Sequence, residues 1–451
     1  MENQIVKPSI LPGFMELLPT DQILFNNMLD TIRKNYERFG FLPIDTPTIE
    51  KSEILLAKGG GDTEKQIYRF TKGDSDLSLR FDLTVPLARY VSQHFSELTF
   101  PFRRYHIGKV FRGERNQRGR FREFYQCDID IIGNENLSII NDAEIPSVIY
   151  STFKDLGFDS FTIKLNNRKI LNGFFQWLNI ENKVDVLRTI DKLDKIGIAG
   201  VKEELNKIGL EDSTIDTLMT FIKIQGTNED ILHSLEIMNV ENDTFKTGLN
   251  ELTEVINYVK AFGVPEENFT IDLTIARGLD YYTGTIYETF LNDYPKIGSV
   301  CSGGRYDNLA EYYTKQKLPG VGISIGLTRL FYQLKEANII SSNINTLTKA
   351  LVIPMDGCIK EAISIANKLR KEEIYSQVYL DEAKMGKKFT YANKLRIPYV
   401  LLIGPDEVKQ DKITIKNMMT GEQSLVDFAE TLNTLNRWLN KNLKQPWQDA
   451  N

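Results

Sequence analysis

The sequence predicts an α+β protein that ends in a smaller α/β unit, and three patterns carry this prediction. Polar and apolar residues alternate from position 120 to 131, and a strand-like run at 105–114 with a loop at 115–119 precedes them, which indicates an antiparallel β-hairpin. The segment 168–262 is rich in Lys, Glu, Leu and Ile and contains amphipathic stretches typical of helices. Beyond residue 349, strand-like and helix-like stretches alternate, as in an α/β unit with a largely parallel sheet.

Length and composition are those of a globular, multidomain protein. The chain has 451 residues, of which 41% are hydrophobic and 26% charged, so it is long enough for two or three domains. Its three cysteines are widely spaced and odd in number, which indicates neither a disulfide framework nor a zinc site. No apolar run approaches the ~20 residues that span a bilayer, and residues 1–14 lack a signal or transit pattern. These features predict a cytoplasmic protein.

The first hundred residues predict structural elements before any site. Apolar residues near helical spacing predict a helix over 22–39, which Gly40 would end. Pro47 lies in the extended stretch that follows and favours an edge or interface strand. A short strand over 78–82 and a helix start at Thr84 would place Asp82 and Thr84 at a strand end, with Thr84 as the helix N-cap.

The region 101–125 concentrates positive charge in a protein whose net charge is −6. It holds eight Lys or Arg residues and two acids, which calls for an anionic partner or heavy solvation. In the second strand of the predicted hairpin the odd positions are mostly apolar and the even ones mostly polar. A solvated basic surface is the simpler interpretation, but an aromatic ring and carboxylates among the arginines favour a binding surface. The residues expected to line it are Arg112, Arg120, Phe124, Gln126 and Asp130.

Four further positions are open to both a structural and a functional interpretation. Arg277 follows an apolar strand-like run and precedes Gly278, so it could reach a ligand or form a surface salt bridge. The pair Tyr281 and Tyr282 could be core aromatics or ligands. The segment 303–307 predicts a tight turn beside the expected binding surface. Arg329 would lie in the first turn of a helix, where the helix dipole disfavours a cation unless an anion shares the site.

Four motifs together resemble a known family. FRGERNQRGRFREFYQCDID (111–130) resembles motif 2 of class II aminoacyl-tRNA synthetases, and RGLDYYTG (277–284) resembles a motif peculiar to histidyl-tRNA synthetases. CSGGRYDNL (301–309) and GVGISIGLTRL (320–330) are similar to that family's second glycine-rich segment and motif 3. The resemblance covers nearly the whole chain and is weakest between about 183 and 264.

The resemblance implies a domain organisation. Residues 1–167 and 263–340 would form a class II catalytic domain around an antiparallel sheet, with its first helix and strand in a homodimer interface. Residues 168–262 would form an inserted helical domain near the tRNA acceptor arm, although a helical spacer explains the same pattern. A linker at 341–348 would lead to a C-terminal α/β anticodon-binding domain at 349–451, which carries a net charge of +3.

The resemblance also implies an activity and its residues. Histidine would be activated with ATP and Mg²⁺ to histidyl-adenylate and then transferred to tRNA(His), with no tightly bound cofactor and no membrane contact. Arg112 and Arg277 would be catalytic. ATP would be bound by Arg112, Glu114, Arg120, Phe124, Arg277 and Arg329. Histidine would be bound by Asp82, Thr84, Arg112, Gln126, Asp130, Arg277, Tyr281 and Tyr282.

Two other functional interpretations share parts of this pattern. Catalytically silent relatives regulate ATP phosphoribosyltransferase, but they usually lack the C-terminal α/β domain and keep the catalytic arginines poorly. A basic RNA-binding protein would explain the charged hairpin but not Asp82, Arg277 and Arg329 together. The sequence therefore favours the ligase.

Overall fold

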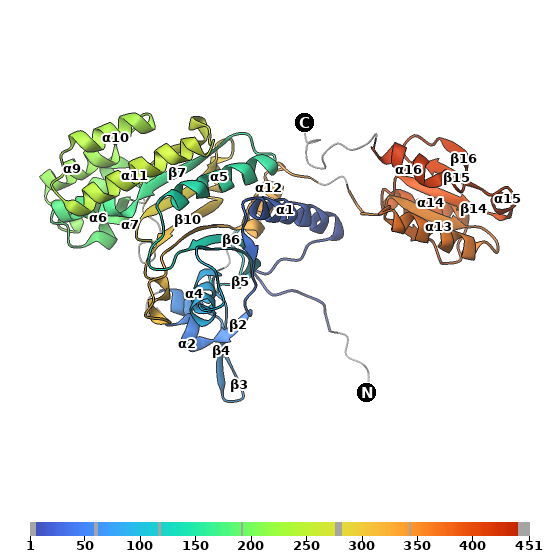
Figure 1. The fold of residues 1–451 in the computed structure, drawn as a ribbon, viewed down its shortest axis with the longest axis horizontal. Coiled ribbons are helices and arrows are strands. Elements are labelled where there is room, and N and C mark those ends of the chain that lie inside the picture. Colours follow the sequence, from blue (N-terminus) through green and yellow to red (C-terminus); the bar gives the residue numbers. More distant parts are fainter. Residues whose placement is uncertain are drawn as a thin grey trace. The chain divides into compact units, whose positions relative to one another are not determined.

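The computed structural model describes residues 6–57, 62–115, 119–190, 193–275, 282–341 and 344–440. The chain divides into two compact units (Figure 1). Unit 1 comprises residues 1–15 and 29–333, and unit 2 comprises 16–28 and 334–451. Among the described residues, no helix is long and apolar enough to cross a membrane.

Unit 1 is built on an eight-stranded sheet in the order β1-β5-β6-β11-β10-β9-β7-β8. The six inner strands are antiparallel, whereas the short edge strands β1 and β8 pair in parallel with β5 and β7. The sheet is mixed but mostly antiparallel. Its strands are β1 (Leu42–Pro43), β5 (Phe102–Phe111), β6 (Glu123–Ile132), β7 (Phe161–Asn167), β8 (Phe269–Ile271), β9 (Thr285–Leu291), β10 (Cys301–Tyr306) and β11 (Gly320–Ile325).

The hairpin predicted from the charged region is the centre of this sheet. Strands β5 and β6 pair antiparallel from Phe102↔Ile132 to Phe111↔Glu123. The odd residues Cys127, Ile129 and Ile131 are fully buried and belong to the core. A second, three-stranded sheet contains β2 (Ile49–Lys51), β3 (Arg69–Lys72) and β4 (Ser75–Leu79).

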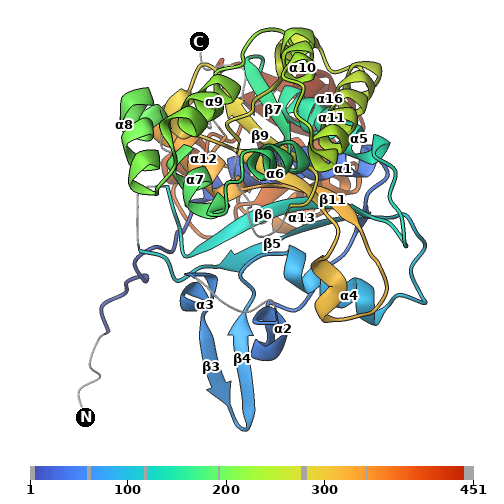
Figure 2. The same cartoon turned by 90° about the vertical axis from the view of Figure 1, so that its left-hand side faces the viewer.

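Helices cover both faces of the central sheet. Figures 1 and 2 show α5 and α11 (Asp243–Ala261) on one side of β5 and β6, and α4 on the other. Against α4, Leu87 and Val91 pack on Phe102 and Ile132. The helices outside the inserted segment are α1 (Pro19–Arg38), α2 (Ser52–Leu55), α3 (Asp62–Gln66), α4 (Thr84–Gln93), α5 (Ile140–Asp155) and α12 (Leu327–Glu336).

The segment 168–262 is helical, as its composition predicts. Its helices α6 and α11 pack closely because Gly173 and Gly248 lie at their contact, where an added Cβ would meet Phe245 N at 2.3 Å and Ile170 N at 2.7 Å. Phe174 stacks on Phe221 with ring centroids 4.2 Å apart. The helices are α6 (Arg168–Trp177), α7 (Lys183–Ile190), α8 (Leu193–Lys207), α9 (Asp212–Ile222), α10 (Asn228–Ile237) and α11 (Asp243–Ala261).

Unit 2 contains a five-stranded sheet in the order β13-β12-β14-β15-β16. The first three strands are parallel and the last two antiparallel, so the sheet is less parallel than the sequence pattern indicates. Alternate residues of β12 enter two hydrophobic clusters, which places helices on both faces. Its elements are β12 (Ala350–Pro354), α13 (Ile359–Lys371), β13 (Ser376–Val378), α14 (Met385–Lys394), β14 (Tyr399–Ile403), α15 (Pro405–Lys409), β15 (Lys412–Asn417), β16 (Gln423–Asp427) and α16 (Thr431–Asn440).

Candidate active site

The polar face of the central hairpin lines a cavity of about 310 Å³, here called the wide cavity. Residues of β6, β10, β11 and α12 also line it, so segments distant in sequence meet there. Six of the predicted site residues lie in its wall, and two of them, Phe124 and Gln126, show that even positions of β6 face a cavity. The six are Arg112, Glu114, Arg120, Phe124, Gln126 and, from α12, Arg329.

Arg112 contacts two aromatic rings. Its guanidinium carbon lies 4.4 Å from the ring centre of Phe81 and 5.1 Å from that of Phe124. Its Nε also donates to the carbonyl of Phe81 at 3.3 Å. The two ring contacts and this hydrogen bond orient the fork, so Arg112 can present its remaining N–H groups to an oxyanion with little reorganisation.

Glu114 and Arg120 pair with each other at the mouth of the wide cavity. The distance between Arg120 Nη1 and Glu114 Oε2 is 3.4 Å, and the side chain of Arg120 is 56% exposed. An exposed pair of this length contributes little to stability, about 0–1 kcal/mol. Both side chains are therefore available to a ligand at small cost.

Arg329 lies in the first turn of α12, as predicted. The N–H of Tyr125 donates to the Thr328 hydroxyl at 2.8 Å, which fixes the start of this helix against β6. The Arg329 guanidinium donates to the carbonyl of Ile297 at 3.2 Å. The helix start thus brings a cation and the positive end of the helix dipole to the same wall.

A second, smaller space of about 30 Å³, here called the narrow cavity, adjoins the wide one. The two share Ser302 and Ser324, and Gln126 Nε2 donates to Ser324 Oγ at 2.8 Å between them. A ligand could therefore occupy both. Thr84, Asp128, Asp130, Tyr282, Ser302, Tyr306, Gly322, Ile323 and Ser324 line the narrow cavity.

Burial raises the pKa values of both carboxyls of the narrow cavity. Asp130 is 4% exposed and its pKa rises to about 6, while Asp128 is 2% exposed and its pKa rises to about 7. The guanidinium of Arg104 opposes both shifts. Arg104 is fully buried on β5, opposite Asp130 in register, and forms an ion pair with it.

Asp82 and Thr84 lie at the start of α4, and Thr84 is the first residue of the helix rather than its predicted N-cap. The helix begins at Thr84, and its cap is not the Thr84 hydroxyl: the Asp82 carboxylate accepts the N–H of Val85 at 3.0 Å. Asp can take this role because its short side chain folds back onto the first helical turn. Burial raises the pKa of Asp82, against the lowering effect of the Val85 N–H and of Arg112. Thr84 remains in the wall of the narrow cavity.

The segment 303–307, predicted as a tight turn, is instead the end of strand β10 and the residue after it. Its glycines serve close packing rather than a turn. A Cβ at Gly304 would lie 2.8 Å from the ring of Tyr282. Because glycine has no side chain, this ring can pack against β10 beside the cavity.

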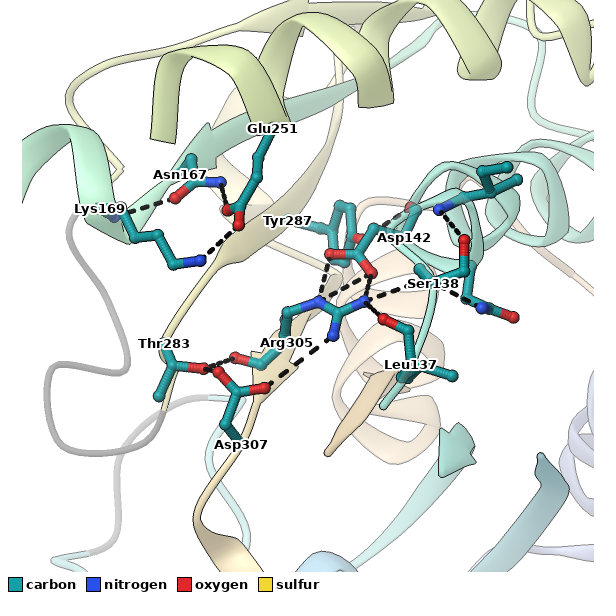
Figure 3. Close-up of polar contacts among 12 residues, drawn as sticks. Leu137, Ser138, Asp142, Asn167, Lys169, Glu251, Thr283, Tyr287, Arg305 and Asp307 are labelled. Carbon is teal, nitrogen blue, oxygen red and sulfur yellow. Dashed lines mark hydrogen bonds and ion pairs between the residues drawn. The ribbon is translucent and has the colours of Figure 1, made fainter. Parts of the chain in front are cut away.

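Arg305 joins β10 to α5 through a buried ion pair (Figure 3). Its guanidinium donates to Asp142 at 2.6 and 3.0 Å and to the carbonyls of Leu137 and Ser138. In the same view, the Thr283 hydroxyl donates to Asp307 at 2.6 Å. These bonds fix the chain immediately after Tyr282, and Arg305 is therefore structural.

Two predicted site residues, Arg277 and Tyr281, lie outside the described residues, as do positions 116–118 of the hairpin loop. Within the described ranges, no group of three or more His, Cys, Asp or Glu side chains could hold a metal ion. Glu114 is the one carboxylate among the described residues that line the wide cavity.

The family model for histidyl-tRNA synthetase matches residues 13–330, which is more than half of the chain. The chain belongs to the histidyl-tRNA synthetase family. A second model, for an anticodon-binding domain, matches residues 349–438.

Relatives and a solved structure agree with this assignment over nearly the full length. The chain is 69% identical to a histidine–tRNA ligase of Clostridium tetani, over 96% of this chain and 99% of the relative. It is 53% identical to that of Finegoldia magna, over 96% and 100%. The crystal structure of histidyl-tRNA synthetase from Nostoc has a TM-score of 0.89 at 40% identity, over 96% and 100% of the two chains.

In this histidyl-tRNA synthetase family member, several residues of the narrow cavity were not predicted as site residues. Asp128 lies on the even face of β6 that the alternation marks, so its signal was present. Arg104 and Tyr306 reach Asp130 only through strand pairing, of β5 with β6 and of β10 with β11 and then β6. No local pattern in the sequence carries that information.

Proposed function

We propose that the protein is a histidine–tRNA ligase. Histidine is activated with ATP to histidyl-adenylate, pyrophosphate is released, and histidine is then transferred to the 3′ end of tRNA. The observation that carries this proposal is the joined pair of cavities in a chain of this family, one lined by arginines and the other by buried carboxylates. The first suits a triphosphate, and the second suits a small cationic or N–H-bearing side chain.

The wide cavity is the proposed ATP site. Arg112, oriented by its two rings, binds the α-phosphate and the substrate carboxylate, and it stabilises the charge that develops as the carboxylate attacks phosphorus. Arg120 binds the terminal phosphates. Glu114 and Phe124 contact the amino group and the ring of adenine. Arg329 stacks on the adenine from the opposite wall and meets the γ-phosphate.

The histidine site is proposed around the narrow cavity. Asp82 and Thr84 receive the α-ammonium at the start of α4. Gln126, Asp130 and Tyr282 belong to the imidazole end of the site. Tyr281 and Arg277, outside the described residues, are proposed as a second aromatic ligand and as a catalytic cation.

Magnesium is proposed to arrive with ATP. A single carboxylate, Glu114, in the described wall of the wide cavity provides at most one ligand, so phosphate oxygens and water would supply the rest. The ion would neutralise charge on the triphosphate. On the protein side, Arg112 and Arg120 orient the same phosphates.

The domain roles follow from the same proposal. Residues 1–167 and 263–340 form the catalytic domain and 168–262 an insertion that approaches the tRNA acceptor arm. Residues 341–348 link them to an anticodon-binding domain at 349–451. We also propose a cytoplasmic homodimer: the edge strand β1 carries the exposed Leu42, 60% exposed, at a position that a second copy could cover.

The deciding experiment is ATP–pyrophosphate exchange with each of the twenty amino acids, followed by aminoacylation of tRNA. We expect exchange with histidine alone, and charging of tRNA(His). The Arg277→Ala variant should lose roughly 10²–10³ in exchange rate while histidine affinity changes much less. Histidine binding without exchange would contradict the ligase and favour a regulatory role, whereas tRNA binding without ATP turnover would favour an RNA-binding protein.

A further inference from the structure

Strand β7 ends between the two stretches of chain that flank the segment 276–281. In the central sheet β7 lies between β8, which is parallel to it, and β9, which is antiparallel. The register places Ile271, the last residue of β8, opposite Leu165. It places Thr285, the first residue of β9, opposite Asn167. The chain therefore leaves β8 on one side of the C-terminal end of β7 and returns as β9 on the other side.

Asn166, the last but one residue of β7, bonds the chain just before that segment. Its side chain is completely buried, and its Nδ2 donates to the carbonyls of Leu273 and Ile275, each at 3.3 Å. Its Oδ1 accepts the N–H of Asn167 at 2.8 Å. Because a buried carbonyl that loses its donor costs free energy, this one amide fixes the chain up to Ile275.

Arg168, two residues further along, bonds the chain just after the segment. Its N–H donates to the carbonyl of Gly284 at 2.9 Å. The N–H of Thr283 also donates to the carbonyl of Arg305 at 2.8 Å. The described chain on both sides of the segment is thus fixed by one short junction, by the side chain of Asn166 before it and by the backbone of Arg168 after it.

The same junction begins the inserted helices (Figure 3). Asn167 caps α6, because its side chain accepts the N–H of Lys169 at 2.9 Å. The Nδ2 of Asn167 donates to Glu251 on α11 at 2.9 Å, and Lys169 pairs with the other oxygen of this carboxylate. Glu251 therefore ties the start of α6 to α11, and it ties both helices to the residue that lies between Asn166 and Arg168.

We propose that Asn166 is a positioning residue for the chemical step, which holds the chain that leads to Arg277, and that Glu251 makes this placement depend on the inserted helices. This inference rests on the function proposed above, in which Arg277 is a catalytic cation. Arg277 is two residues beyond Ile275, which is at most about 7 Å of extended chain. A cation stabilises developing charge only where it is held in place, and a misplacement of about 1 Å can lower a rate roughly 10²-fold.

The first test compares Asn166→Ala with Asn268→Ala in ATP–pyrophosphate exchange with histidine. Asn268 is a matched control, because it is a buried asparagine that donates to the carbonyl of Phe161 at 2.9 Å, at the opposite end of β7. Both variants should lower the melting temperature. We expect the kcat of Asn166→Ala to fall roughly 10- to 100-fold with a much smaller change in the KM for ATP, and Asn268→Ala to keep the parent kcat. Equal kcat values in the two variants would mean that Asn166 is only structural.

A double-mutant cycle with Arg277→Ala tests whether Asn166 acts through that arginine. In the Arg277→Ala background the further change Asn166→Ala should alter kcat by no more than about twofold, because the cation that it positions has already been removed. Losses that multiply in the double variant would overturn the inference. A parent-like rate in Arg277→Ala would overturn it as well.

Glu251→Gln tests the link to the inserted helices, and it decides the matter if Asn166→Ala does not fold. Glutamine keeps an acceptor for Asn167 but loses the ion pair with Lys169, so we expect kcat to fall roughly threefold to tenfold in the absence of tRNA. Glu229→Gln, which removes an ion pair between α10 and α11 away from the junction, should match the parent. A parent-like kcat in Glu251→Gln would contradict the link.

The parent protein separates this inference from the proposed function. Exchange by the parent with histidine is required by both. A parent that shows none contradicts the proposed ligase itself. An active parent whose kcat is matched by Asn166→Ala contradicts only the positioning role of Asn166.

Discussion

The wide and narrow cavities of unit 1 are built in opposite ways. The wide cavity presents cations that are partly exposed, such as Arg120 at 56%, and that carry weak or replaceable contacts. The narrow cavity is lined by two buried carboxyls, and one of them, Asp130, is paired with the fully buried Arg104 on the neighbouring strand. A site for a large polyanion can remain solvated until the ligand arrives, whereas a site that must discriminate a small ring has to be preorganised and dry.

The largest expected effect is at the ion pair that organises the narrow cavity. Arg104→Met would leave the buried Asp130 carboxylate without its cation, and we expect the free energy of unfolding to fall by roughly 3–5 kcal/mol. Thermal and urea unfolding measure this loss. Adding Asp130→Asn to Arg104→Met removes the uncompensated charge and should restore part of the stability. A single variant as stable as the parent would show that the pair is not buried in solution.

In the wide cavity the same kind of change should alter rate rather than stability. Arg112→Gln keeps hydrogen-bonding capacity but removes the charge beside the rings of Phe81 and Phe124. We expect the exchange rate to fall roughly 10²–10³-fold, as for other electrostatic stabilisers, with a smaller change in the KM for histidine. Lys109→Gln, which removes a cation that pairs with Glu123 on the same hairpin, is the matched control. An equal loss in the two variants would mean that only the overall charge of the hairpin matters.

The contrast between the cavities also explains what the sequence could predict. Apart from Arg329, the predicted residues of the wide cavity lie in one contiguous, unusually charged hairpin, whose alternation marks its polar face. Asp128 lies on that face too, but the alternation alone cannot distinguish it from Asp130, because Arg104 and Tyr306, which bond Asp130, lie on other strands. The same limit applies to 303–307: its glycines suggest a turn locally, yet strand pairing on both sides makes it part of the sheet.

A third prediction uses the raised pKa of Asp128. Because its folded-state pKa of about 7 lies above the value of 3.8 that is usual for an aspartate, the protonated carboxyl stabilises the fold at acid pH. This stabilisation is lost as the pH rises from about 4 through 7. Asp128→Asn, which cannot ionise, should therefore be more stable than the parent at pH 8 by on the order of 1–3 kcal/mol, and the difference should vanish near pH 4. Unfolding curves across this range measure it. A difference that does not change with pH would show that Asp128 titrates normally.

The smallest effect on stability is expected at the mouth of the wide cavity. Arg120 is more than half exposed and its contact with Glu114 is 3.4 Å long, so Arg120→Gln should change the free energy of unfolding by less than about 1 kcal/mol. The variant nevertheless removes a positive charge that would attract a bound triphosphate. We therefore expect the KM for ATP to rise while the KM for histidine stays constant. Salt gives a sharper comparison, because exposed charges are screened and buried ones are not. Raising the ionic strength should therefore weaken ATP binding in the parent more than in Arg120→Gln and leave histidine affinity nearly unchanged in both. A comparable loss of histidine affinity would mean that solvent reaches the narrow cavity and that its carboxylates are not enclosed.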